Sequence, residues 1–213
     1  RKRFDFPMPE FVDYETDSLE KLGSFDFDDA YDRRRFFEAG DNQIAGVGDG
    51  FERNSPAWIE TVKKLRPDFP VYGSMGECSE CLTRLIGQEN TMLWIGMFPD
   101  RMGAVIERIG QFYLDCLKAE LEAAADLLDG MVIWGDVAYK KSLFVSPDYW
   151  RTHFRPWVEA MVRECHAHKL PVIYHGCGNV SLIFEDFIEM GLESYNPLEA
   201  KAWMDCVDLR QRY

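Results

Sequence analysis

Short apolar runs alternate with longer amphipathic segments along most of the chain, and this alternation constrains the fold more than any other feature. The pattern is typical of buried parallel strands that are each followed by a helix. We expect strands at residues 42–48, 69–76, 131–136, 170–175 and 192–197. A closed barrel of such units has eight. About five units therefore predict an α/β fold that is an incomplete (β/α)8, or TIM-type, barrel, with a doubly wound sheet as the other arrangement.

Two Ser-Pro pairs mark helix starts. Ser55-Pro56 and Ser146-Pro147 place serine at the N-cap and proline at the first helical position, where a missing N–H costs nothing. Asp148 adds a carboxylate to the first turn of the second helix, where the helix dipole favours it. We expect helices at residues 56–65, 80–86, 99–128, 147–165, 180–190 and from residue 205 onward.

The chain divides into two parts of different character. Residues 1–40 are acidic and aromatic without a sustained period, and they predict an irregular N-terminal cap with at most one short helix. Residues 41–213 carry the repeated units and predict the partial barrel. The sequence opens without methionine and closes on a charged run, 209–213, that is typical of the middle of a helix. We expect the chain to be a piece of a longer enzyme.

Charge and composition exclude several classes of function. The chain has 37 acidic and 24 basic residues and a formal charge of -13, which disfavours binding to nucleic acid or to anionic lipid. No stretch approaches the roughly 20 apolar residues that a membrane helix needs. The six cysteines lack the density of a disulfide-stapled domain and fit a reducing compartment, so we expect a cytoplasmic protein.

In a parallel barrel the reactive groups lie just after the strands, because the carboxyl ends of all strands meet at one face. This position selects Glu77, Asp136, His175, Cys177, Asn196 and Glu199.

Among these residues, His175 and Cys177 are two positions apart on an extended segment and face the same way, with a glycine after each of them. Imidazole and thiolate are ligands that zinc prefers. The alternative is that His175 hydrogen-bonds within the barrel mouth and Cys177 only packs.

The other cysteines offer weaker metal candidates. Cys78 and Cys81 have zinc-like spacing but lack a second pair, and at a strand-to-helix junction such spacing is more often incidental. Cys206 follows Cys177 by one βα unit but stands at a predicted helix start.

Several segments, in this order and spacing, resemble the uroporphyrinogen decarboxylase superfamily. The resemblance runs from about Phe69 to the end of the chain. Its His-x-Cys-Gly-Asn segment is similar to the branch of cobalamin-dependent methyltransferases of the methylcobalamin:coenzyme M type. The segments that carry it are 134–136, 146–150, 154–157, 171–179 and 195–199.

The resemblance implies a (β/α)8 barrel that binds zinc through His175, Cys177 and a distant cysteine beyond this sequence. The metal would activate a thiol that accepts a methyl group from a corrinoid (cobalamin). We assign Asp136 and Glu77 as candidate catalytic residues, and Asn179 and Asn196 as candidate cofactor-binding residues.

The resemblance therefore predicts a zinc-dependent methyltransferase. We expect its partners to be a small-molecule thiol or methyl donor and a corrinoid protein. The alternative activity is uroporphyrinogen decarboxylation, although the chain lacks the family's N-terminal arginine-rich loop for substrate carboxylates. A third possibility is a non-catalytic barrel fragment or a corrinoid-protein partner, because a shared scaffold does not decide function.

Overall fold

The computed structural model describes residues 2–3, 10–11, 14, 16–27, 29–31 and 56–213. Four parallel strands form its central sheet, in the order β3-β4-β5-β6. Each strand pairs with the next one in the sequence, which is the arrangement in part of a (β/α)8 barrel. The α/β fold is thus confirmed. These strands are β3 (Tyr72–Gly76), β4 (Gly130–Trp134), β5 (Val172–His175) and β6 (Ser194–Asn196). The predicted strand at 42–48 lies outside the described residues.

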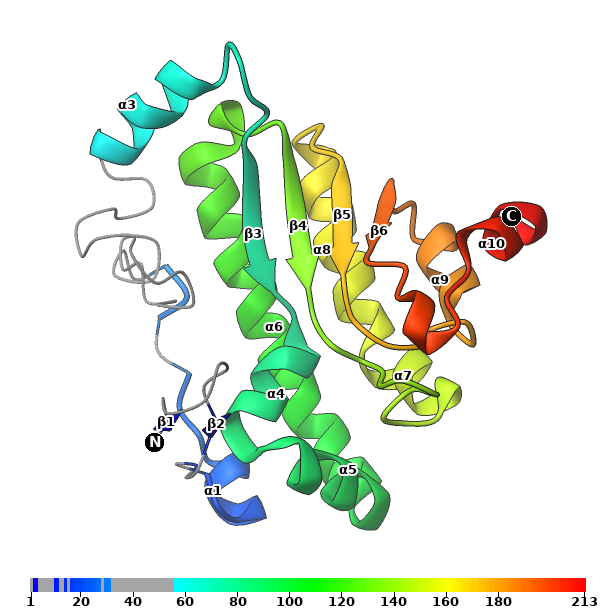
Figure 1. The fold of residues 1–213 in the computed structure, drawn as a ribbon. Helices are drawn as coiled ribbons and strands as arrows, with labels where there is room; N and C mark the ends of the chain where they lie inside the picture. Colours follow the sequence, from blue (N-terminus) through cyan, green and yellow to red (C-terminus); the bar gives the residue numbers. More distant parts are fainter. Residues whose placement is uncertain (1, 4–9, 12–13, 15, 28, 32–55) are drawn as a thin grey trace.

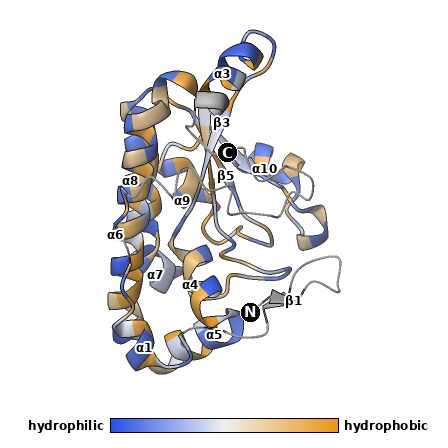
Figure 2. Cartoon of the chain, turned by 90° about the vertical axis from the view of Figure 1, so that its left-hand side faces the viewer, coloured by the Kyte–Doolittle hydropathy of each residue, from blue (hydrophilic) through white to orange (hydrophobic). Residues whose placement is uncertain are grey.

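Helices follow the strands and cover one side of the sheet. The two longest helices, α6 and α8, lie in one layer behind the strands (Figures 1 and 2). Their inward residues join the main hydrophobic core, which also takes in Met131 and Val172 from the sheet. The helices that follow β3 are α4 (Cys78–Ile86), α5 (Gln88–Met97) and α6 (Pro99–Ala124). The later ones are α7 (Pro147–His153), α8 (Arg155–Ala167), α9 (Phe184–Glu189) and α10 (Cys206–Arg212).

The smaller elements lie before the sheet and in the connections. Before the sheet the described residues form the antiparallel pair β1 (Lys2–Arg3) and β2 (Glu10–Phe11), with helices α1 (Leu19–Gly23) and α3 (Pro56–Leu65). Short 3₁₀ turns, η1 (Ala125–Leu127) and η2 (Ala200–Ala202), complete the connections. The predicted boundary between residues 40 and 41 falls outside the described residues, so the division into a cap and a barrel stays a prediction.

Both Ser-Pro signals mark helix starts. Helix α3 begins at Pro56, and α7 begins at Pro147 with the Ser146 side chain accepting a hydrogen bond from Tyr149 N. The prediction of one continuous helix over 147–165 is wrong, because the structure ends α7 at His153 and begins α8 at Arg155. Pro156 explains the break, since it has no N–H and its ring would clash with the preceding turn.

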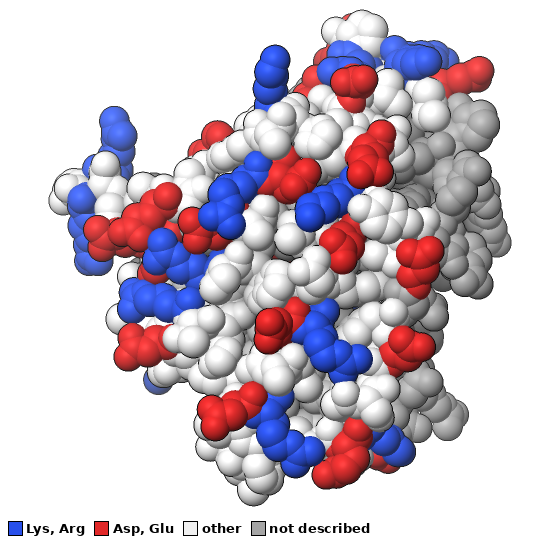
Figure 3. All heavy atoms as spheres, turned by 180° about the vertical axis from the view of Figure 1, so that it is seen from behind, with Lys and Arg blue, Asp and Glu red and all other residues white. Residues whose placement is uncertain are grey.

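The outer surface of the helices is charged and mixed. On the face that Figure 3 shows, acidic and basic side chains are interspersed over the described helices. None of the described helices is long and apolar enough to cross a membrane.

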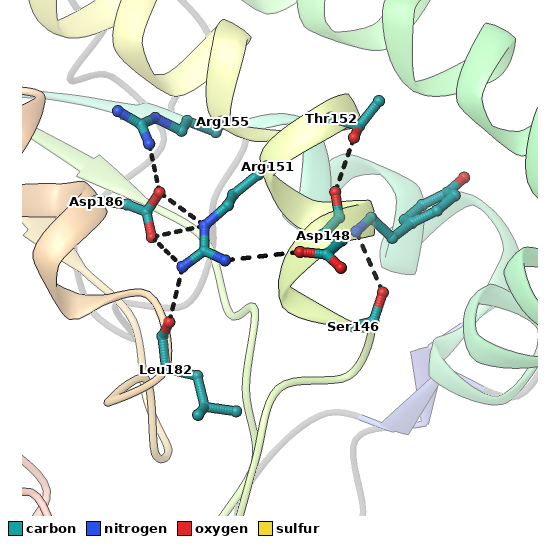
Figure 4. A network of polar contacts seen from close by, with 8 residues as sticks. Ser146, Asp148, Arg151, Thr152, Arg155, Leu182 and Asp186 are labelled. Atoms are coloured by element: carbon teal, nitrogen blue, oxygen red, sulfur yellow. Dashed lines mark hydrogen bonds and ion pairs between the residues drawn. The ribbon is translucent and has the colours of Figure 1, made fainter.

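A buried carboxylate ties α7, α8 and α9 together (Figure 4). Asp186 of α9 is only 4% exposed. Arg151 of α7 donates to both its oxygens, with Nε 3.0 Å from Oδ1 and Nη2 2.9 Å from Oδ2. Arg155 of α8 also contacts Oδ1 and extends to Glu189, 2.9 Å away. The shared contacts with Asp186 thus join α7 to α8 where the helix is interrupted.

We expect Asp186→Asn to lower the free energy of unfolding by about 2 kcal/mol, because it removes the shared anion from two arginines. Asp148→Asn is the matched control. Asp148 also pairs with Arg151, at 3.7 Å, but its side chain is 97% exposed, so its loss should cost about 0.5 kcal/mol or less. Urea unfolding of both variants measures the difference, and equal costs would refute a stabilising role for the buried contact.

Candidate functional site

The last residues of the four parallel strands lie side by side. Gly76 pairs with Trp134, Trp134 with His175, and His175 with Asn196. The segments that follow the strands therefore emerge along one edge of the sheet, as expected for a barrel mouth. Figure 1 shows the arrowheads of β3, β4 and β5 at this same end.

The His175 side chain is fixed by the neighbouring strand. Its Nδ1 atom lies 2.9 Å from Oδ1 of Asn196. An amide oxygen only accepts hydrogen bonds, so in a neutral imidazole this contact favours the proton on Nδ1 and leaves the lone pair on Nε2. A hydrogen bond to the ring nitrogen that does not bind the metal commonly orients metal-binding histidines. Asn196, predicted to bind a cofactor, thus contacts the predicted metal ligand.

The Cys177 thiol is exposed and lies beside two carboxylates. Partial burial, the negative charges of Asp136 and Glu199, and a hydrogen bond with Asp136 raise the pKa of this thiol. The free side chain is therefore a poor nucleophile at neutral pH. A bound cation would reverse this effect, because a coordinated thiol is deprotonated.

Asp136 and Asn179 both hold the loop that bears Cys177. Oδ1 of Asp136 accepts a hydrogen bond from Cys177 N at 2.7 Å. The Asn179 side chain donates to Ala202 O at 2.8 Å and accepts from Ser181 N at 3.1 Å. Both polar atoms of the Asn179 side chain thus hydrogen-bond to backbone groups, and its cofactor-binding role stays a prediction.

Glu77 lies on the other side of the sheet from His175. It contacts Tyr174, with its Oε1 atom 3.5 Å from the hydroxyl, and consecutive residues of a strand point to opposite faces. Glu77 is 0% exposed, and burial raises the pKa of its carboxyl group. Its side chain caps α4 by accepting from Ser79 N at 3.0 Å and also contacts the Ser79 hydroxyl. The structure therefore separates Glu77 from Cys177, and its catalytic role stays a prediction.

The remaining cysteines do not join His175 and Cys177. Cys78 and Cys81 are buried in α4, and burial raises the pKa of the Cys81 thiol to about 11. Cys206 is exposed at the start of α10. Within the described ranges, no three His, Cys, Asp or Glu side chains form a group that could hold a metal ion. His175 and Cys177 fit zinc by donor type, and their role as metal ligands stays a prediction.

Three tyrosines contribute to this edge without having been singled out from the sequence. The Tyr174 hydroxyl donates to Gly135 O at 3.1 Å, and the Tyr195 hydroxyl donates to Gly176 O at 2.8 Å. Tyr139 accepts a hydrogen bond from Asn179 N through its backbone. The strand positions of Tyr174 and Tyr195 next to His175 and Asn196 are the signal that could have identified two of them.

A comparison of the sequence with known protein families gives a match. The model of the family described as "Uroporphyrinogen decarboxylase (URO-D)" matches residues 52–201. This range covers all four parallel strands and the residues from Glu77 to Glu199 discussed above. No curated protein matches the chain.

Proposed function

Because the chain belongs to the uroporphyrinogen decarboxylase family, we propose that it is an enzyme of that scaffold which transfers a methyl group. The transfer would run between a corrinoid and a thiol, or another methyl donor or acceptor, with zinc as the metal. The single observation that carries this proposal is the pair at the end of β5. His175 keeps Nε2 available while Asn196 occupies Nδ1, and Cys177 exposes its thiol two residues later.

The charges around this pair favour a cation. Asp136 and Glu199 both lie close enough to raise the pKa of the Cys177 thiol. Two carboxylates lower the energy of a divalent ion and, conversely, repel an anionic substrate. A polycarboxylate such as uroporphyrinogen therefore suits this edge of the sheet less well than zinc does.

His175 and Cys177 would hold the metal, together with a distant cysteine that the family resemblance implies beyond this sequence. A zinc ion bound there would supply a Lewis acid that lowers the pKa of a substrate thiol. The residues of this chain would orient the two donors: Asn196 fixes the imidazole, and Asp136 fixes the backbone of Cys177. The partners we propose are a small thiol or methyl donor and a corrinoid protein.

Metal analysis tests the proposal. We expect the full-length protein to retain close to one zinc ion per chain after gel filtration, and we expect His175→Ala to lose it. His153→Ala is the matched control, since the His153 ring lies on α7 against Gly103 of α6. A folded, full-length protein that binds no zinc would contradict the proposal.

Decarboxylation of uroporphyrinogen is the second candidate, and the name of the matching family favours it. It predicts release of carbon dioxide from uroporphyrinogen with no dependence on zinc or corrinoid. Measuring methyl transfer and carbon dioxide release on the same preparation separates the two activities.

A further inference from the structure

The loop after β5 is held by its backbone from the β6 side. Gly176 N donates to the main-chain oxygen of Asn196 at 3.0 Å, which continues the pairing of the two strands. Two residues later, Gly178 N donates to Oε2 of Glu199 at 2.9 Å. A side chain thus continues the hydrogen-bond ladder where β6 has ended.

The same loop is held from the β4 side by the alternate N–H groups. Cys177 N donates to Oδ1 of Asp136 at 2.7 Å, and Asn179 N donates to Tyr139 O at 3.0 Å. Four consecutive N–H groups therefore bond alternately to the end of β6 or the segment after it and to the segment after β4. The alternation carries past the end of β5 the pattern of a strand between two neighbours, in which successive N–H groups point in opposite directions.

Glu199 is itself anchored. Its main-chain oxygen accepts hydrogen bonds from Ala202 N at 2.8 Å and Met204 N at 3.2 Å, which fix its backbone at the start of η2. Ala202 O in turn accepts from the Asn179 side chain. The carboxylate is thus presented to Gly178 from a closed turn rather than from a free loop.

Gly178 leaves the loop little room to move toward β4. Its φ is +87°, a left-handed conformation that favours glycine. A Cβ placed there would lie 2.7 Å from Tyr139 O. The loop therefore passes directly against the segment after β4, and Glu199 holds it from the opposite side.

We propose that Glu199 is a positioning residue of the β5 loop. Glu199 fixes the Cys177–Gly178 peptide and Asp136 fixes the preceding Gly176–Cys177 peptide, so that the Cys177 thiol and the His175 imidazole keep a constant separation before any ligand binds. A carboxylate makes a stronger hydrogen bond to an N–H group than a neutral acceptor does. This inference rests on the proposed function for the identity of the ligand, but the order of the loop can be measured without it.

Amide hydrogen exchange on the metal-free protein tests the loop directly. In Glu199→Ala we expect the Gly178 amide to exchange about tenfold faster or more, because its acceptor is lost. Glu199→Gln keeps a side-chain oxygen at the same reach and should stay within about threefold of the wild type. Glu185→Ala, which removes one exposed charge from α9, should leave the rate unchanged. Unchanged exchange in Glu199→Ala would overturn the proposal.

Zinc affinity, measured by chelator competition, distinguishes the effect of the Glu199 hydrogen bond on the loop from the effect of the Glu199 charge. We expect Glu199→Ala to weaken binding about tenfold or more, as loss of residues that orient metal ligands does, and Glu199→Gln to weaken it by about threefold at most. Equal weakening in both variants would mean that the charge matters and the hydrogen bond does not, which would overturn the positioning role. A wild-type protein without zinc would contradict the proposed function, and the exchange rates alone would then decide the role of Glu199.

Discussion

Gly135→Ala is expected to lower the free energy of unfolding by roughly 3 kcal/mol or more. A Cβ on Gly135 would lie 1.7 Å from Oε1 of Glu77 and 2.6 Å from its Cδ atom. The Glu77 carboxyl group would have to leave a site that is 0% exposed, where Ser79 N donates to it at 3.0 Å. Water cannot replace the lost contacts in that position, so the full cost appears in stability. Urea unfolding measures it.

Two controls isolate the clash between Gly135 and Glu77. Gly96→Ala makes the same change in α5, where nothing lies within 4 Å of the new Cβ, and it should stabilise the helix by about 0.5–1 kcal/mol. In a Glu77→Ala background the Gly135→Ala change should cost far less than in the wild type, because the colliding group is gone. An equal cost in both backgrounds would contradict this explanation.

The sheet could be predicted from the sequence because its strands are nearly continuous apolar runs. Predicted ranges such as 170–175 contain the observed strand Val172–His175, with extra residues at the start. Pro171 explains part of that difference, since proline cannot donate to the ladder of hydrogen bonds. The helix starts were predictable where a capping side chain determines them locally, as at Ser146 and Asp205.

Helix α5 was not predicted, because it shows no single apolar face. Ile95 is buried, but Met92, Leu93 and Met97 of the same helix are exposed. An amphipathic period therefore does not appear in the sequence of Gln88–Met97. The helix depends on tertiary packing against α4 and α6, which no local pattern contains.

The candidate site was predictable in its strand-end residues but not in their contacts. The position of His175 and Asn196 after neighbouring strands places them close together, and the structure shows their contact. The burial of Glu77 was not predictable, because it depends on Tyr174, 97 residues further along the chain. The bond between Gly178 and Glu199 likewise depends on the exact lengths of two loops.

Glu77→Gln is expected to remove a pH dependence from stability. Burial raises the pKa of the Glu77 carboxyl group above its ordinary value of 4.5, so the folded protein binds this proton more tightly than the unfolded chain does. The contribution of this proton to the stability of the folded protein is fully present below pH 4.5, and it is lost as the pH rises through the pKa that Glu77 has in the folded state. Each unit of difference between the two pKa values removes about 1.4 kcal/mol.

The measurement is urea unfolding of wild type and Glu77→Gln at a series of pH values from about 5 to about 8. Glutamine has no proton to lose, so the variant should gain stability relative to the wild type as the pH rises, whatever its cost at low pH. Glu89→Gln, an exposed change in the first turn of α5, shows the effect of net charge alone. Parallel pH profiles for wild type and Glu77→Gln would contradict this prediction. They would mean that the folded and unfolded states bind the Glu77 proton equally tightly, because only a difference in proton binding between the two states makes stability depend on pH.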